Sequence, residues 1–80
     1  MTEVLLYSRP GCGLCDEARE VIIGHRGRGE LEFEFREVDI TGDDALELDY
    51  GIRIPVVLID GQERFEVRVD PSEFAAALGG

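Results

Sequence analysis

The sequence predicts an α/β domain whose strands and helices follow in the order β-α-β-α-β-β-α. Short apolar segments, typical of strands covered on both faces, alternate with segments of helical periodicity. An Asp-Gly pair in the C-terminal half predicts a hairpin between the last two strands. Because a helix connects the first two strands, they should be parallel with a right-handed crossover. We therefore expect a four-stranded mixed sheet flanked by three helices in one domain spanning residues 1–80.

The first third of the chain predicts a buried strand followed by an amphipathic helix. Residues 4–7 are apolar without alternation, and the Ser-Arg-Pro-Gly sequence at residues 8–11 ends this strand. A helix is predicted from about residue 12 to residue 24, with a stripe of apolar residues at positions i, i+4, i+7 and i+8: Leu14, Ala18, Val21 and Ile22. Glycines at the end of this segment predict a polar loop.

The middle third predicts an edge strand and a short helix. Residues 31–36 alternate between apolar and charged side chains, as expected for a strand with one solvated face. Val38 and Ile40 then follow on the opposite parity, so either a bulge or the end of the strand near Glu37 is expected. Thr41 and Asp44 form a Thr-x-x-Asp helix start, which predicts a helix over residues 42–50.

The last third predicts a hairpin and a terminal helix. Residues 56–59 form a second continuous apolar strand, and residues 64–69 alternate after the Asp60-Gly61 turn. Asp70 and Pro71 are typical of the cap and the first position of a helix. We expect the two apolar strands in the middle of the sheet, the two alternating strands at its edges and helices on both faces.

The composition excludes several classes of function. A net charge of −10 and a pI of about 4.3 argue against nucleic acids and anionic membranes as partners, because their phosphates would be repelled. All eight basic residues are Arg, which excludes a lysine nucleophile. The chain has no apolar segment near the roughly 20 residues that span a bilayer, and its N-terminus lacks the basic region of a secretory signal. We therefore expect a cytoplasmic protein without membrane contact.

The Cys12-Gly13-Leu14-Cys15 motif carries the predicted chemistry, because it follows a strand and opens a helix. Unpaired N–H groups and the helix dipole stabilise a thiolate at Cys12 and lower the pKa of its thiol. Cys15, one turn inward, should be more buried and suited to attack a mixed disulfide. Gly13 permits close approach of a partner backbone, and Arg9 adds positive charge if its side chain turns toward the sulfur.

Two other interpretations of the cysteine pair stay open at this point. The pair would form half of a zinc site if His25 and carboxylates completed it, or if two protomers shared the metal. Alternatively, both thiols would be buried and inert. His25 itself lies near the predicted helix end, where an imidazolium or a solvated ring is expected rather than a catalytic group.

Residues 7–15 resemble the active-site segment of glutaredoxins, and most closely that of the short bacterial glutaredoxin-like proteins of the thioredoxin-fold superfamily. The resemblance implies a thioredoxin-like fold and a small thiol-disulfide oxidoreductase, active in redox homeostasis or as an electron donor to a disulfide-containing partner. It assigns Cys12 as the nucleophile and Cys15 as the resolving cysteine. It also implies a cis bond between Ile54 and Pro55, which exposes the backbone before the proline to an incoming peptide or thiol.

The resemblance also sets expectations for the reductant. Leu14 replaces the usual aromatic residue of the glutathione-using glutaredoxins, and residues 68–70 replace their glycine pair. Arg53 and Asp70 would still pair with the carboxylate and the amine of glutathione, so these departures argue against glutathione without excluding it. The resemblance also implies an alternative function, in which the protein binds an iron-sulfur cluster or a metal that bridges two protomers.

The predicted site and its partners follow from these arguments. The substrate-binding residues are expected to be Arg9, Gly13, Leu14, Ile54 and Pro55. The redox centre is the Cys12–Cys15 disulfide, and no metal and no bound organic cofactor are required. The expected partners are a disulfide-containing protein or a low-molecular-weight thiol, and a reductase; the chain is expected to be a monomer.

Overall fold

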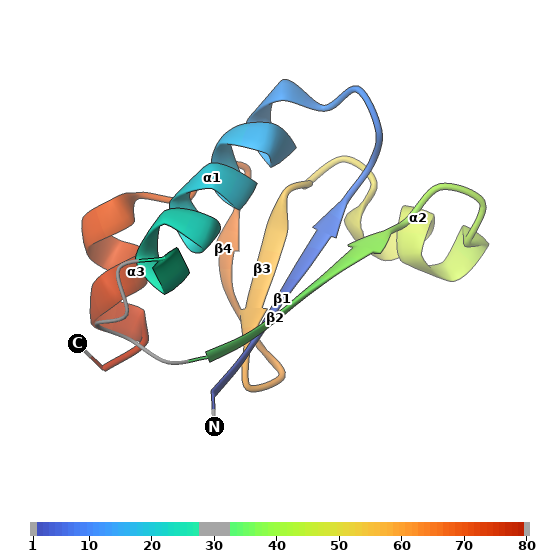
Figure 1. Cartoon of the computed structure of the whole chain (residues 1–80). Helices are drawn as coiled ribbons and strands as arrows, with labels where there is room; N and C mark the ends of the chain where they lie inside the picture. Colours follow the sequence, from blue (N-terminus) through green and yellow to red (C-terminus); the bar gives the residue numbers. More distant parts are fainter. Residues whose placement is uncertain (1, 28–32, 80) are drawn as a thin grey trace.

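The computed structural model describes residues 2–27 and 33–79, with side chains up to His25 in the first of these ranges. Figure 1 shows its helices and strands in the predicted order. These elements are β1 (Thr2–Ser8), α1 (Gly13–Gly27), β2 (Phe33–Asp39), α2 (Asp44–Tyr50), β3 (Val56–Ile59), β4 (Gln62–Glu66) and α3 (Pro71–Ala77). In the described part of the chain, no helix combines the length and apolar composition that crossing a membrane requires.

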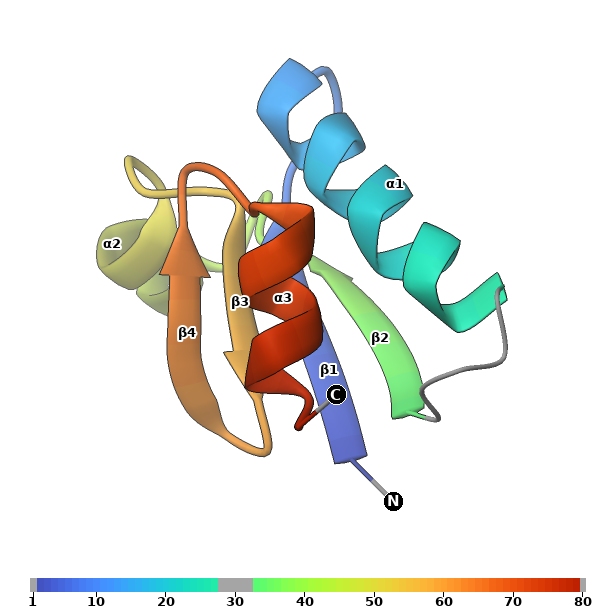
Figure 2. The same ribbon diagram turned by 90° about the vertical axis from the view of Figure 1, so that its left-hand side faces the viewer.

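The four strands form one mixed sheet in the order β2-β1-β3-β4. Strands β1 and β2 are parallel, whereas β3 is antiparallel to both β1 and β4. The apolar strands β1 and β3 are central, as predicted, because their side chains are covered from both faces. Helices α1 and α3 lie on one face of the sheet and α2 lies on the other (Figure 2).

Strand β2 differs from both alternatives that the sequence left open. It pairs with β1 residue for residue from Phe33 to Asp39, without a bulge and without an end near Glu37. Phe33 and Glu37 share the face that α1 covers, and Glu37 meets Arg19 of α1 there. The alternation of apolar residues stops at Glu37 because this position, on the face that α1 covers, is occupied by the ion pair with Arg19 instead of an apolar side chain. Residues 31 and 32 of the predicted strand lie outside the described residues.

Helix α2 begins differently from the prediction. Its N-cap is Asp43, whose side chain accepts a hydrogen bond of 3.1 Å from the backbone N–H of Leu46. The N–H of Thr41 instead donates to Oδ1 of Asp39 at 2.8 Å, in a turn that precedes the helix. The predicted Thr-x-x-Asp start is therefore wrong, because an aspartate nearer the helix takes the cap.

The hairpin turn and the terminal helix follow the prediction, but β4 begins at Gln62 rather than Arg64 and ends earlier than predicted. Asp60 and Gly61 both have positive φ angles, 51° and 84°, as a two-residue type I′ turn requires. Asp70 caps α3 by accepting a 3.0 Å hydrogen bond from the N–H of Glu73. Strand β4 ends at Glu66 rather than continuing toward Val69, because Val67 has a φ of 70° and leaves the strand.

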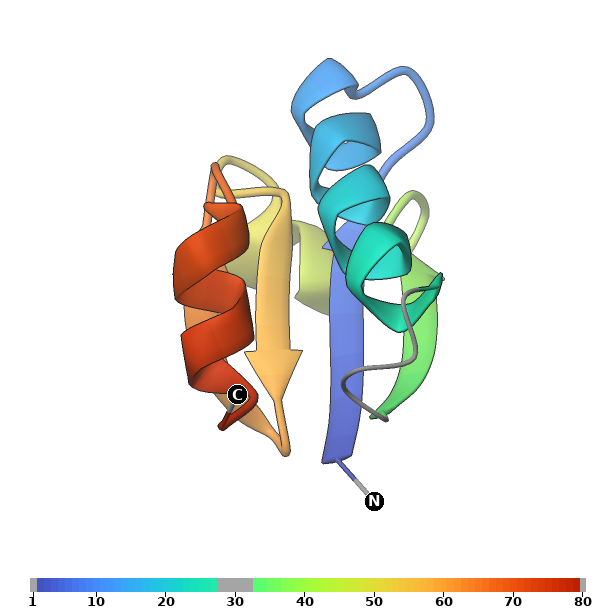
Figure 3. The same cartoon turned by 60° about the vertical axis from the view of Figure 1, so that its left-hand side comes forward.

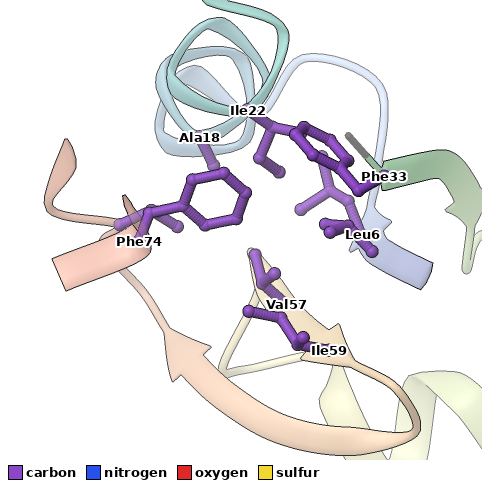
Figure 4. Close-up of a cluster of buried hydrophobic side chains, with 9 residues drawn as sticks. Leu6, Ala18, Ile22, Phe33, Val57, Ile59 and Phe74 are labelled. Atoms are coloured by element: carbon purple, nitrogen blue, oxygen red, sulfur yellow. The ribbon is translucent and has the colours of Figure 1, made fainter. Parts of the chain in front are cut away.

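The hydrophobic core lies between the sheet and the layer formed by α1 and α3, which pack side by side (Figure 3). Phe74 of α3 is fully buried at its centre and makes edge contacts with the rings of Phe33 and His25. Figure 4 shows the side chains that converge there from both helices and three strands: Leu6, Ala18, Ile22, Phe33, Val57, Ile59 and Phe74. This core fixes α1 against β1 and thereby holds the start of α1 at the end of the sheet.

Candidate active site

The cysteine motif lies where the chain turns from β1 into α1. Strand β1 ends at Ser8, and Gly11 has a φ of 79°, a conformation that glycine adopts without steric cost. Cys12 directly precedes the first residue of α1, and its carbonyl accepts the first hydrogen bond of the helix, from the N–H of Asp16 at 3.1 Å. Cys12 is therefore in the N-cap position, as the sequence indicated.

The two cysteines form a disulfide across the first turn of α1, with their Cα atoms 5.2 Å apart. The backbone N–H of Cys15 donates a hydrogen bond of 3.1 Å to Sγ of Cys12. Cys15 is fully buried, whereas Cys12 is partly exposed. The expectation that Cys15 is the more buried of the two is confirmed.

Pro55 lies at the same end of the sheet as the disulfide. Val56 pairs with Tyr7, so the residue before β3 and the residues after β1 meet at one edge. The Ile54–Pro55 bond is cis, as expected from the family resemblance, and Pro55 is buried. The structure thus brings together both parts of the predicted substrate site.

Gly13 and Leu14, between the cysteines, face outward to different degrees. Gly13 is exposed, and a Cβ atom built on it would meet no other atom within 4 Å. Leu14 is half-buried and lines a groove that extends from the motif toward α3. The role expected for Gly13, close approach of a partner backbone, stays a prediction.

Arg9 makes a contact that the sequence did not predict. Its guanidinium forms an ion pair with Glu47 of α2, with Nη2 and Oε1 3.2 Å apart. Its Nε atom is buried and has no hydrogen-bond partner among the described residues. The positive charge of Arg9 is therefore matched by a carboxylate on the other side of the sheet from α1.

A polar network that sequence analysis missed lies beneath the first turns of α1. Arg19 donates from Nε to Oε1 of Glu37 at 2.7 Å and from Nη1 to Asp16 at 2.7 Å. The hydroxyl of the buried Ser8 donates to Oε2 of Glu37 at 2.7 Å. The hydrogen bonds from Arg19, supported by that of Ser8, hold the pKa of the Glu37 carboxyl below its usual value. The network ties the Cys-bearing helix to the ends of β1 and β2.

Arg53, two residues before Pro55, is bound by the chain itself. Its guanidinium donates to carboxylates of Glu63 and Glu66, at 3.1 Å each, and to the carbonyl of Asp49 at 2.9 Å. It also lies 5.2 Å from the centre of the Tyr50 ring. These hydrogen bonds raise the pKa of Arg53 and lower that of Glu63. The guanidinium that was expected to pair with a glutathione carboxylate therefore already has acceptors.

The tyrosines beneath this guanidinium connect it to the central strand. The ring of Tyr50, at the end of α2, stacks on that of Tyr7 in β1 with centroids 4.5 Å apart. Burial is the main reason that the pKa of Tyr50 is raised. Tyr7, Tyr50 and Arg53 thus form a column that supports the loop before Pro55. Two of its three members, Tyr50 and Arg53, are close in sequence, in the Tyr-Gly-Ile-Arg segment at residues 50–53.

The remaining candidate, His25, contacts the backbone of its own helix and the hydrophobic core. Its Nδ1 lies 2.9 Å from the carbonyl of Val21, and its ring meets the edge of Phe74. Within the described residues, no group of three or more His, Cys, Asp and Glu side chains is placed to hold a metal ion.

Comparison with known proteins identifies the family. The profile of the glutaredoxin-like domain (DUF836) matches residues 3–79. The chain belongs to this family. An uncharacterized protein of Mycobacterium tuberculosis, Rv0508, is 33% identical over 95% of this chain and 81% of its own length.

Solved structures support the same assignment. The crystal structure of protein XcR50 from X. campestris is 34% identical, covers 95% of both chains and superimposes with a TM-score of 0.77. A mutant thioredoxin from Halobacterium salinarum shares 20% identity with a TM-score of 0.68, over 96% of this chain and 71% of its own, which shows the thioredoxin fold. The glutaredoxin-like thioredoxin fold and the Cys12–Cys15 disulfide together indicate thiol redox function.

Proposed function

We propose that this protein is a thiol-disulfide oxidoreductase in which Cys12 attacks the substrate and Cys15 resolves the mixed disulfide. One observation carries the proposal: Sγ of Cys12, a partly exposed residue, accepts the Cys15 N–H at the start of α1, while Cys15 is fully buried. A thiolate at Cys12 gains a charge-assisted hydrogen bond and the partial positive charge of the helix end. Cys15 is shielded from any sulfur except one already attached to Cys12.

The proposed cycle starts from the dithiol. The Cys12 thiolate attacks one sulfur of the substrate disulfide, forms a mixed disulfide and releases the other substrate sulfur as a thiolate, which takes up a proton. Cys15 then loses its proton and attacks Sγ of Cys12, which forms the Cys12–Cys15 disulfide and releases the second substrate thiol. Two electrons and two protons thus pass from the protein to the substrate. An external dithiol or a reductase returns the protein to the dithiol form.

The loop before β3 completes the proposed substrate site. Ile54 is half-buried and precedes Pro55 at the sheet edge next to the disulfide, so its backbone is placed to pair with an extended substrate segment. The substrate is then a disulfide-containing protein or a low-molecular-weight disulfide. We place this activity in the cytoplasm, which keeps thiols reduced, and in a monomer.

The occupied guanidinium of Arg53 supports a reductase or a dithiol, rather than glutathione, as the source of electrons. Glutathione would have to displace Glu63, Glu66 or the Asp49 carbonyl before its carboxylate reached this group. Each of these carboxylates competes with the glutathione carboxylate for the same N–H donors. We therefore expect recycling by thioredoxin reductase or dithiothreitol to outrun recycling by glutathione and glutathione reductase.

Variants of the two cysteines test the assigned roles. Reduced wild-type protein, Cys12→Ser and Cys15→Ser are mixed with a disulfide-linked peptide, and products are followed by mass spectrometry. We expect Cys12→Ser to leave the peptide oxidised and Cys15→Ser to accumulate a mixed disulfide at Cys12. A mixed disulfide that forms at Cys15 in Cys12→Ser, as fast as at Cys12 in Cys15→Ser, would reverse or abolish the assignment.

A further inference from the structure

The turn that joins β1 to α1 borders a polar hollow of about 170 Å³. Its walls come from the end of β1, the first turns of α1 and the end of β2: Ser8, Arg9, Pro10, Asp16, Arg19, Glu37 and Asp39. Ser8 precedes Cys12 by four residues and Asp16 follows it by four. Because charges interact over about 10 Å at 0.1 M salt, the charge balance of this hollow acts on a thiolate at Cys12.

Asp16 puts a negative charge one helical turn from the proposed nucleophile. Its N–H donates to the carbonyl of Cys12 at 3.1 Å, and side chains at positions i and i+4 of a helix have Cβ atoms about 5–6 Å apart. A carboxylate in the first turn of α1 is favourable for the helix, because it lies at the positive end of the dipole. The same carboxylate repels a thiolate at Cys12. The start of the helix therefore holds two negative groups that oppose each other when Cys12 ionises.

Glu37 adds a second negative charge at this end of the sheet. Its Oε2 accepts a hydrogen bond of 2.7 Å from the hydroxyl of Ser8, the last residue of β1. Only 29% of the Glu37 side chain is exposed, so water screens its charge less than that of a fully exposed carboxylate. The carboxylate is ionised at neutral pH, because the hydrogen bonds from Arg19 and Ser8 lower its pKa. Asp16 and Glu37 together would thus oppose the ionisation of Cys12.

Arg19 contacts both carboxylates with one guanidinium group. Its Nη1 donates to Oδ1 of Asp16 and its Nε donates to Oε1 of Glu37, each at 2.7 Å. It reaches Asp16 from three positions further along α1, and Glu37 across the contact between α1 and β2. With one positive charge against two negative ones, the three side chains carry a net charge of −1 instead of −2. Arg19 therefore removes half of the charge that opposes a thiolate.

The other charged groups of the hollow have partners elsewhere. The guanidinium of Arg9 pairs with Glu47 of α2 at 3.2 Å, and Oδ1 of Asp39 accepts the N–H of Thr41 at 2.8 Å. In the part of the chain that the structure describes, Arg19 is the only basic residue that forms ion pairs with the two carboxylates beside the motif. Their compensation thus depends on a single side chain.

We propose that Arg19 is a positioning residue, which holds the two carboxylates so that the Cys12 thiolate forms against one net negative charge instead of two. The inference rests on the proposed function of Cys12 as the attacking thiolate and adds a residue that controls its ionisation. Arg19 acts on the carboxylates and not on the sulfur, to which the Cys15 N–H donates. A purely structural tie between α1 and β2 would contribute little, because partly exposed ion pairs add little to stability.

Charge variants measure the effect on Cys12 directly. Each is made in the Cys15→Ala background, in which Cys12 is the only thiol, and its alkylation by iodoacetamide is followed as a function of pH. The reagent is neutral, so charge does not alter its approach. Arg19→Gln leaves the carboxylate pair with a charge of −2, and a double variant, Asp16→Asn with Glu37→Gln, leaves +1 on the guanidinium. A triple variant that combines all three substitutions leaves no charge.

We expect the pH midpoint of alkylation to follow this charge. Arg19→Gln should raise the midpoint, the triple variant should lower it below the background value, and the double variant should lower it most. At a separation on the order of 8 Å, one unit charge shifts the midpoint by about 0.4 to 1.5 pH units, for effective dielectric constants of about 80 to 20. In 1 M salt, where the Debye length is about 3 Å, these differences should shrink.

Arg36→Gln is the matched control, because it also removes one arginine from this region of the chain. Arg36 is exposed and lies next to Glu37 in β2, but on the opposite face of the sheet. It pairs with Leu5 in the middle of β1, further from the motif than Ser8. It should shift the midpoint by less than half as much as Arg19→Gln. Far-UV circular dichroism and thermal melting establish which variants are folded.

A structural role makes a different prediction for one pair of variants. Arg19→Gln and the triple variant both break the ion pairs between α1 and β2, so a structural role would shift their midpoints alike. Equal midpoints in these two variants, or no change in Arg19→Gln, would overturn the inference. If Arg19→Gln does not fold, Asp16→Asn alone decides, because it keeps the pair of Arg19 with Glu37 and should still lower the midpoint. Midpoints that follow charge in a protein that reduces no disulfide-linked peptide would refute the oxidoreductase function alone.

Discussion

The N–H of Cys15 should account for much of the reactivity of Cys12, and two substitutions at one position isolate it. Cys15→Ala removes the resolving thiol but keeps the N–H that donates to Sγ of Cys12 at 3.1 Å. Cys15→Pro removes both the thiol and this donor, at a position in the first turn of α1, where proline is tolerated. The two variants therefore differ chiefly in one hydrogen bond to the thiolate.

The size of the effect follows from the charge on the acceptor. A hydrogen bond to an ionised group contributes about 1.5–3 kcal/mol, equivalent to a roughly 10- to 150-fold change in the thiolate population below neutral pH. A more basic thiolate is also a better nucleophile, with a Brønsted coefficient of about 0.4–0.5. This compensation leaves a net decrease of about 3- to 20-fold in the alkylation rate of Cys12 in Cys15→Pro relative to Cys15→Ala.

Alkylation by iodoacetamide at pH 6, followed by mass spectrometry, measures this ratio. Far-UV circular dichroism and thermal melting establish that both variants are folded. Arg9→Gln serves as a charge control, because the guanidinium is already paired with Glu47, and should alter the rate less than two-fold. If the two Cys15 variants are both folded and react within two-fold of each other, the backbone N–H does not stabilise the thiolate and this reasoning is wrong.

Three further predictions concern side chains around the site. Because the folded pKa of Glu37 lies below its ordinary value of 4.5, the unfolded chain takes up this proton first and stability falls as the pH drops below 4.5. Urea titrations between pH 6 and 3 should show a smaller loss in Glu37→Gln. Asp43→Ala should lower the free energy of unfolding by about 1 kcal/mol, and Thr41→Ala by less than half of that, in urea denaturation. Glu63→Gln combined with Glu66→Gln should remove two acceptors of the Arg53 guanidinium and raise the ratio of glutathione-dependent to dithiothreitol-dependent turnover at least two-fold. An unchanged ratio would contradict the proposed reason why glutathione is the weaker reductant.

The sheet could be predicted from the sequence because its signals are local and agree with one another. The apolar residues 4–7 and 56–59 have no solvated face, so they belong at the centre of any sheet that helices cover. Asp60-Gly61 specifies a turn whose positive φ angles match the twist of the hairpin. Each of these signals acts within a few residues, and tertiary packing reinforces it.

The parts that could not be predicted depend on residues distant in sequence. The apolar alternation of β2 stops at Glu37 because Arg19, on another element, faces this position. The sequence around Glu37 contains no sign of that partner. Asp43 and Thr41 are both good capping residues, and the choice depends on where packing places α2. Val67 has no local reason to adopt a positive φ; carbonyls from the loop before β3 impose it.

The acidic composition bears on which groups can stabilise a thiolate at Cys12, the proposed nucleophile. Arg9, Arg19 and Arg53 lie on segments that flank the motif or its proline, and each is bound by at least one carboxylate. In a chain with 18 acidic residues against 8 basic ones, these three guanidinium groups already have negative partners. Backbone N–H groups carry no such counterion, and α1 directs that of Cys15 at Sγ of Cys12. We therefore expect the helix end, rather than these three arginines, to stabilise the proposed Cys12 thiolate.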